Sequence, residues 1–253
     1  MTRMKTFIGA ALLAGAAIAG ATSAAHADDL ALTGNIALTT DYEFRGLSQT
    51  QHEPAVQGGF DLTYGQFYAG TWASNLNFGS SGSLQVHVPM ELDVYGGIRP
   101  KVGPVSLDLG VIAYLYPNSY DPGAGEFNYY EAKAAATINP IAPLTLGATV
   151  NFSPEFPLKG GTAWYTELNA AFAVSDVFSI SGAVGHQTAD AAGYFVTSSG
   201  GTDSYTTYNV GATYTTHGFA LDLRYVGADE TILNLAGQEQ SDDTVVFTIK
   251  RSL

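Results

Sequence analysis

Apolar and polar residues alternate along much of this chain, and the alternation constrains the fold more than any other feature. Apolar side chains occupy every second position over residues 86–94, and again over 105–113. Residues two apart point to the same face of a β-strand, so each run has one apolar face and one largely polar face. The pattern predicts an all-β protein.

The same pattern predicts twelve strands, and no helical periodicity competes with it beyond residue 28. Their expected ranges are 30–42, 54–64, 67–74, 85–98, 104–115, 127–138, 144–152, 162–174, 178–187, 204–216, 219–227 and 242–250. An even number of strands allows a closed antiparallel barrel to place both chain ends on one side.

The connections between these strands alternate in length. The short ones are 65–66, 99–103, 139–143, 175–177 and 217–218, and they carry Gly, Pro or Asn breakers or stay within three residues. The long ones are 43–53, 75–84, 116–126, 153–161, 188–203 and 228–241. Transmembrane barrels have short periplasmic turns and long outer loops. Soluble up-and-down barrels can alternate too, so the loops do not decide the class alone.

Aromatic residues cluster near both ends of the expected strands. Toward the long loops are Tyr42, Tyr116, Phe127, Tyr129, Tyr130, Phe152, Trp164, Tyr165, Tyr205 and Tyr225, and toward the turns Tyr64, Phe67, Phe172, Phe178, Tyr214 and Phe219. Two aromatic belts are typical of the two interfaces of a membrane. The alternative is a soluble sandwich with these residues in its core. Together with export, the loops and belts favour a single closed antiparallel transmembrane β-barrel.

The first 27 residues predict export. Arg3 and Lys5 precede an apolar run over residues 7–21, and Ala25-His26-Ala27 fits a small-x-small cleavage site. The run is shorter than the roughly 20 residues of a membrane-spanning helix. We expect residues 1–27 to be a cleaved N-terminal signal helix, and residues 28–253 to form one barrel domain in the outer membrane of a Gram-negative bacterium.

Composition excludes several functions. The formal net charge is -13 with no basic cluster, whereas nucleic-acid binding needs clustered Lys and Arg, so no nucleic-acid partner is expected. The absence of Cys rules out disulfides and thiol chemistry. The sequence has no His-x-Ser pair, Walker loop, His-Glu-x-x-His or dinucleotide-binding motif. It therefore predicts no catalytic residues, no cofactor and no metal site.

If the aliphatic faces contact lipid, the polar faces line the lumen. The candidate pore-lining residues are Asp41, Asp61, His87, Glu91, Asp93, Tyr95, Asp108, Glu131, Lys133, Glu167, Asp222 and Arg224. Eight carboxylates on this face, against Lys133, Arg224 and Lys250, leave an excess of five negative charges. Such a pore would favour cations. Lumen charges that only stabilise the barrel through ion pairs explain the same residues equally well.

Several segments carry a family resemblance. Residues 34–61, with Asp41-Tyr42-Glu43-Phe44-Arg45-Gly46-Leu47-Ser48-Gln49 at their centre, together with 67–75, 91–97 and 129–131, resemble the TorF family of proteobacterial porins. The resemblance implies an outer-membrane channel of poorly defined substrate. One departure is the final residue, Leu253, because such barrels commonly end in an aromatic residue.

These observations predict a porin-like channel for passive diffusion of small polar solutes or ions. Its expected partners are those solutes, outer-membrane lipid and lipopolysaccharide, and the outer-membrane assembly machinery. A structural surface barrel without transport is the alternative, and an outer-membrane lipid-modifying hydrolase is a weaker one.

Overall fold

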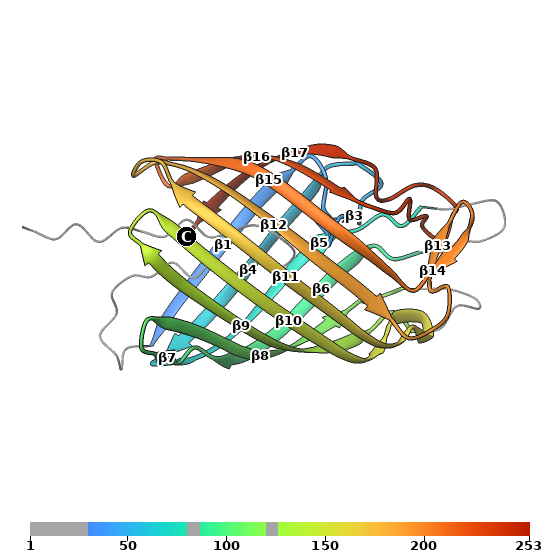
Figure 1. The fold of residues 1–253 in the computed structure, drawn as a ribbon, viewed down its shortest axis with the longest axis horizontal. Coiled ribbons are helices and arrows are strands. Elements are labelled where there is room, and N and C mark those ends of the chain that lie inside the picture. Colours follow the sequence, from blue (N-terminus) through green and yellow to red (C-terminus); the bar gives the residue numbers. More distant parts are fainter. Residues whose placement is uncertain (1–29, 80–86, 120–125) are drawn as a thin grey trace, which may run out of the picture.

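The computed structural model describes residues 30–79, 87–119 and 126–253. Twelve long, tilted strands wrap around a common axis to form a barrel (Figure 1). The expected signal peptide, residues 1–27, and the expected mature start at Asp28 lie outside the described residues. No helix among the described residues is long and apolar enough to cross a membrane.

Each barrel strand pairs antiparallel with the next barrel strand along the chain. The strands are β1 (Ala31–Thr39), β4 (Ala55–Tyr64), β5 (Phe67–Asn75), β6 (Met90–Ile98), β8 (Val105–Leu115), β9 (Tyr129–Ile141), β10 (Leu144–Phe156), β11 (Gly161–Ala173), β12 (Phe178–Ala189), β15 (Ser204–Thr216), β16 (Phe219–Ala228) and β17 (Thr244–Ser252). β1 also pairs with β17, with Ala37 opposite Lys250, and this closes the barrel. The predicted all-β fold of twelve strands is confirmed.

Shorter elements occupy the connections. In the first long loop, β2 (Glu43–Phe44) pairs with β3 (Leu47–Ser48), and β13 (Phe195–Thr197) pairs with β14 (Gly200–Thr202) in a later one. β7 (Lys101–Val102) lies in a short turn, and a 3₁₀ turn, η1, covers Pro157–Lys159. The β13–β14 hairpin lies at one end of the barrel, and the short turns, with β7 among them, lie at the other end (Figure 1).

The outer surface of the barrel is apolar. Aliphatic side chains point outward on successive strands, with Val111 64% and Leu168 69% exposed. The six aromatic residues expected at the turn end, from Tyr64 to Phe219, are all exposed. An exposed band of this kind, with a belt of aromatics at its edge, suits a lipid environment, where a sheet must also close to satisfy its backbone groups.

The expected belt at the loop end is partly wrong. Tyr130, Trp164 and Tyr225 are exposed as predicted, but six other members are buried inside the barrel end: Tyr42, Tyr116, Phe127, Tyr129, Tyr165 and Tyr205. The prediction used only the position along each strand and ignored the face. Tyr129 and Tyr130 illustrate the reason, because adjacent strand residues point to opposite sides of the sheet.

Candidate functional site

The first long loop, residues 40–54, folds into the barrel lumen. Its β2–β3 hairpin turns at Arg45 and Gly46, whose φ angles are 51° and 74°. Two-residue hairpin turns of this kind need positive φ at both central positions, which Gly adopts easily and other residues rarely. Arg45 accepts this backbone conformation at the tip of the hairpin, where its side chain is fixed by contacts with the barrel wall.

Arg45 joins the loop to two distant strands. Its Nη2 donates to Glu131 Oε2 of β9 at 2.6 Å, and its Nη1 donates to Gln187 Oε1 of β12 at 2.7 Å. The guanidinium lies 4.7 Å from the ring centre of Phe44 and 4.3 Å from that of Tyr165. Burial opposes the charge, but the carboxylate of Glu131 and nearby tyrosines raise the pKa of Arg45 above its ordinary value. The buried guanidinium therefore remains charged.

A second contact ties the loop to another strand, β6. Tyr42 Oη donates to Glu91 Oε1 of β6 at 2.6 Å, and Tyr116 Oη donates to the other oxygen of the same carboxylate at 2.8 Å. Glu131 also accepts from Asn151 at 2.7 Å and from Tyr114 at 3.3 Å. The loop is thus held by hydrogen bonds to carboxylates on two strands.

Asp93, two residues beyond Glu91 on β6, lies in the same layer and is 1% exposed. Neither of its carboxylate oxygens has a hydrogen-bond partner in the described part of the chain. Buried carboxylates are normally paired, because taking a charge out of water is costly. Glu91, Asp93 and Glu131 therefore form an acid-rich layer, which the loop compensates with Arg45.

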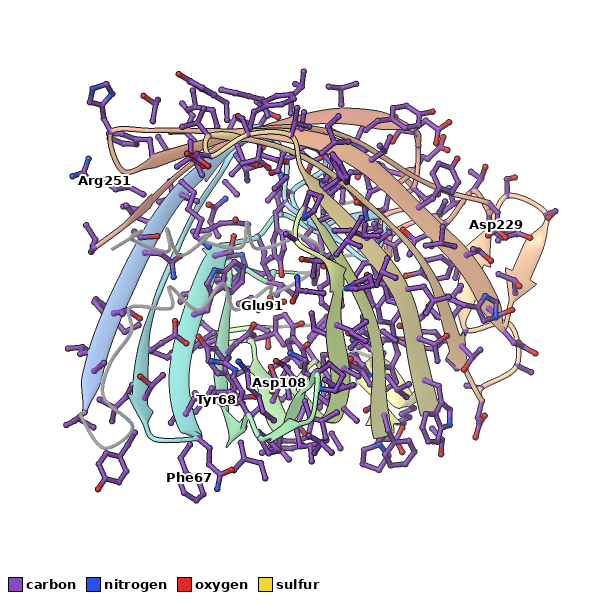
Figure 2. All side chains as sticks on the ribbon, turned by 60° about the vertical axis from the view of Figure 1, so that its left-hand side comes forward. Phe67, Tyr68, Glu91, Asp108, Asp229 and Arg251 are labelled. Carbon is purple, nitrogen blue, oxygen red and sulfur yellow. The ribbon has the colours of Figure 1, made fainter. Side chains whose placement is uncertain are left out.

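A second polar layer lies nearer the turn end. Figure 2 shows Tyr68, Glu91 and Asp108 on the inner side of their strands, whereas Phe67 points away from the barrel. Asp108 accepts from Tyr68 at 2.6 Å and Lys133 at 3.1 Å, and lies 3.5 Å from Arg99. This carboxylate is compensated by two cations.

The structure also shows where the remaining predicted residues lie. Tyr95 donates to Asp61 at 2.9 Å, Tyr165 to Glu167 at 2.8 Å, and Arg224 pairs with Asp222 at 3.1 Å. His87 is exposed and precedes β6, because this strand starts at Met90, just after Pro89, and not at residue 85. Asp41 is buried, but it follows the end of β1 and belongs to the loop.

Two interior arginines were missed by sequence reasoning. Arg45 lies in a connection, where strand periodicity says nothing of direction, and Arg99 lies in a short turn. The signal available for Arg45 was its place at the centre of the segment with the most specific family resemblance.

Four of the buried aromatics, Tyr116, Phe127, Tyr129 and Tyr205, line a cavity of about 450 Å³ at the loop end. Its wall is mainly apolar, with Phe44, Tyr116, Phe127, Phe156, Phe195 and Ile232 among its members. Arg45, Gln49 and Gln187 add polar groups. The cavity adjoins the acid-rich layer, because Arg45 lines the cavity and also pairs with Glu131 of that layer.

One group of side chains in the described residues has the composition of a metal site. Asp41, Glu43 and His52 each place one potential ligand atom within 4.8 Å of the others. Burial and the nearby charge of Asp41 raise the pKa of Glu43 well above its ordinary value. The group lies in the inward-folded loop, outside the barrel strands.

Comparisons with known proteins give a family and a fold. No curated protein sequence matches the chain. Among solved structures, the NanC porin has a TM-score of 0.58 at 9% identity, covering 88% of this chain and 100% of that one. The KdgM porin has a TM-score of 0.54 at 9% identity, covering 87% and 97%. The chain thus shares the fold of these porins.

The family model that matches is described as a bacterial protein of unknown function, Gcw_chp, and it covers residues 23–253. The resemblance to the TorF family is not confirmed by these comparisons. Since the match spans most of its length, the chain belongs to the Gcw_chp family of bacterial proteins.

Proposed function

We propose that this protein is an outer-membrane channel for passive diffusion of small polar solutes or ions, with a preference for cations. The observation that carries the proposal is the acid-rich layer of Glu91, Asp93 and Glu131 inside a closed barrel. The apolar exterior supports insertion into the outer membrane, and the fold shared with NanC and KdgM supports a channel. Residues 40–54 form its constriction.

The proposed selectivity follows from the balance of charges. Since Asp41 belongs to the loop, the strands alone carry seven inward carboxylates against Lys133, Arg224 and Lys250, an excess of four negative charges, and Arg45 and Arg99 reduce this excess to two. A negative excess surrounded by a low-dielectric wall attracts cations and repels anions. A structure of KdgM has been described in complex with oligogalacturonate, which is a polyanion. The acid-rich lumen argues against a polyanion as the solute of this chain.

The pore lining of this channel consists of the predicted set without His87 and Asp41, together with the two arginines. It comprises Asp61, Glu91, Asp93, Tyr95, Asp108, Glu131, Lys133, Glu167, Asp222, Arg224, Arg45 and Arg99. Glu91 and Asp93 are the residues expected to set selectivity. They lie beside the loop, and no cation is paired with Asp93 among the described residues.

Reversal potentials in planar bilayers under a salt gradient test the proposal. We expect the wild-type protein to favour cations, and Glu91→Gln combined with Asp93→Asn to lose most of this preference. The matched control is Glu230→Gln with Glu239→Gln, which removes two carboxylates from an exposed loop and should keep the preference. Anion preference, or no conductance in the wild type, would contradict the proposal.

A structural barrel without transport is the second candidate, because the hairpin of the first loop and its ring of contacts occupy the lumen. The same recordings separate the two functions. A structural barrel stays closed in the wild type and conducts only in a variant that lacks the Arg45 contacts. A channel conducts in the wild type and in that variant.

A further inference from the structure

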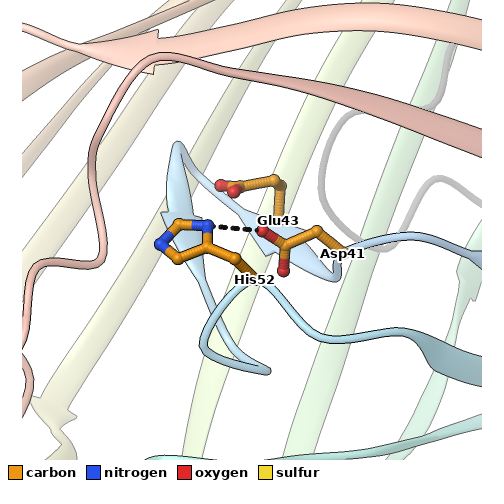
Figure 3. Close-up of side chains that lie close together, drawn as sticks. All are labelled: Asp41, Glu43 and His52. Carbon is orange, nitrogen blue, oxygen red and sulfur yellow. Dashed lines mark hydrogen bonds and ion pairs between the residues drawn. The ribbon is translucent and has the colours of Figure 1, made fainter.

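The inward-folded loop carries a group of side chains that the proposed channel function does not use. Asp41 follows β1, Glu43 lies in β2 and His52 precedes β4, and the three converge on one point (Figure 3). Their potential ligand atoms all lie within 4.8 Å of one another. The spacing of these residues matches no common metal-binding motif, which is why the sequence alone did not reveal them.

Asp41 is held in a fixed orientation. Its Oδ1 accepts hydrogen bonds from Ser48 Oγ at 2.7 Å and from Thr50 Oγ1 at 2.8 Å. Its Oδ2 is thereby directed at His52 Nδ1, 2.8 Å away. Hydrogen-bonded carboxylates of this kind are typical ligands, because the second oxygen is already positioned for a cation.

His52 lies between two carboxylates. Its Nδ1 faces Asp41, and its Nε2 lies 2.9 Å from Asp242 Oδ1. A neutral imidazole carries only one N–H, so it can donate to one of the two carboxylates and must turn a lone pair toward the other. Either a second proton on the ring or a cation at Nδ1 resolves this conflict. With a cation, Nε2–H donates to Asp242 while Nδ1 and Asp41 both bind the metal. Carboxylates commonly orient metal-bound histidines in this way.

Glu43 provides an independent observation. Its Oε1 is buried and has no hydrogen-bond partner in the part of the chain that the structure describes. Two further carboxylates, Asp41 and Asp242, lie beside the imidazole of His52. Arg45, although close in sequence, forms its ion pair with Glu131. A bound cation would give this buried oxygen the partner that it lacks.

We propose that Asp41, Glu43 and His52 bind a divalent transition-metal cation of the zinc class, with Asp242 as the positioning partner of His52. One imidazole nitrogen and two carboxylate oxygens suit zinc, which also binds at sites with three protein ligands and one open position. Calcium and magnesium prefer oxygen ligands alone. Ligand atoms around a tetrahedral zinc ion lie about 3.3 Å apart, so His52 Nδ1 and Asp41 Oδ2 need to separate only slightly.

The metal would fasten the loop at its two ends. Asp41 and His52 flank the β2–β3 hairpin, and Asp242 lies just before β17 in the last long connection. Ser48 and Gln240 already join these two connections by two hydrogen bonds. A metal at this position therefore holds the hairpin, and with it Arg45, in the lumen.

Equilibrium dialysis and calorimetry with ZnCl₂ on the full-length, chelator-treated protein in detergent test the inference. We expect one zinc ion per chain for the wild type, and at least a tenfold weaker affinity for His52→Ala and for Glu43→Gln. Asp242→Asn should weaken binding by about 10- to 100-fold, as is usual for a partner that orients a metal-bound histidine. Cobalt should give the intense visible absorption of a four-coordinate site in the wild type, and this absorption should be absent in His52→Ala.

His186→Ala and His217→Ala serve as matched controls, because both histidines are exposed and lie outside this group. Each should retain the stoichiometry and affinity of the wild type. The inference is overturned if the wild type binds no zinc at millimolar concentration, or if His52→Ala binds as tightly as the controls. Calcium binding that survives His52→Ala would also overturn it, because the site would then use oxygen ligands alone. Circular dichroism establishes that each variant is folded.

Discussion

Replacing Arg45 by Met should destabilise the folded barrel by about 3 kcal/mol. The Met side chain retains much of the apolar stem between Phe44 and Tyr165, so the change removes mainly the charge and its two hydrogen bonds. Removing one member of a buried ion pair costs about 3–5 kcal/mol, because the other charge stays buried. Glu131 keeps its donors Tyr114 and Asn151, which places the expected cost at the lower end of this range.

A double-mutant cycle separates the ion pair from packing. Glu131→Gln alone should also destabilise the barrel, since Arg45 then lacks its counter-charge. Arg45→Met should destabilise the Glu131→Gln variant much less than it destabilises the wild type. We expect a coupling energy of at least about 1.5 kcal/mol. The assay is urea unfolding in lipid vesicles, followed by the fluorescence of the two tryptophans, Trp72 and Trp164. A cost below about 0.5 kcal/mol for Arg45→Met, or additive single variants, would refute the reasoning.

Two further predictions concern the membrane face and the loop. Leu92→Arg should impair insertion by about 2–4 kcal/mol, because it places a charge on the lipid face, whereas Asp93→Asn on the inner face of the same strand should insert normally in a vesicle-folding assay. Equal defects would contradict the assigned faces. Gly46→Ala should raise single-channel conductance, since Gly46 has φ of 74° and a Cβ there would clash with a threonine of β15, displacing the hairpin. Gly103→Ala, at a turn with similar φ and free space around it, should leave conductance unchanged.

The fold was predictable from the sequence because the alternation of apolar and polar residues is local information. A strand with one lipid face and one polar face must show a period of two, and the turns supply breakers such as Gly65 and Gly218. The errors are at strand ends. β1 stops at Thr39, where the chain turns into the lumen, and β6 starts only after Pro89, which lacks a backbone N–H.

The partly wrong prediction of an aromatic belt at the loop end shows where such local information is insufficient. Aromatic side chains near a strand end suit both a membrane interface and a buried cavity, and only the face of the strand distinguishes them. Trp164 and Tyr165 are adjacent, yet Trp164 is exposed while Tyr165 packs against Arg45. Counting aromatics near the ends therefore overestimated the belt, and it missed the cavity that Tyr116, Phe127, Tyr129 and Tyr205 line.

The position of the inward loop could not be predicted from local sequence, because it depends on contacts between residues far apart in the chain. Arg45 is separated by 86 residues from Glu131 and by 142 residues from Gln187. Strand periodicity cannot place a residue in a connection. The charge balance of the strands nevertheless contained a clue, since their inner faces carry seven carboxylates and three cations. Unpaired buried charge is costly, so a barrel with this excess needs cations from elsewhere, and its own loops are the nearest source. Arg45 supplies one of them, and the cation proposed at Asp41, Glu43 and His52 would supply further positive charge.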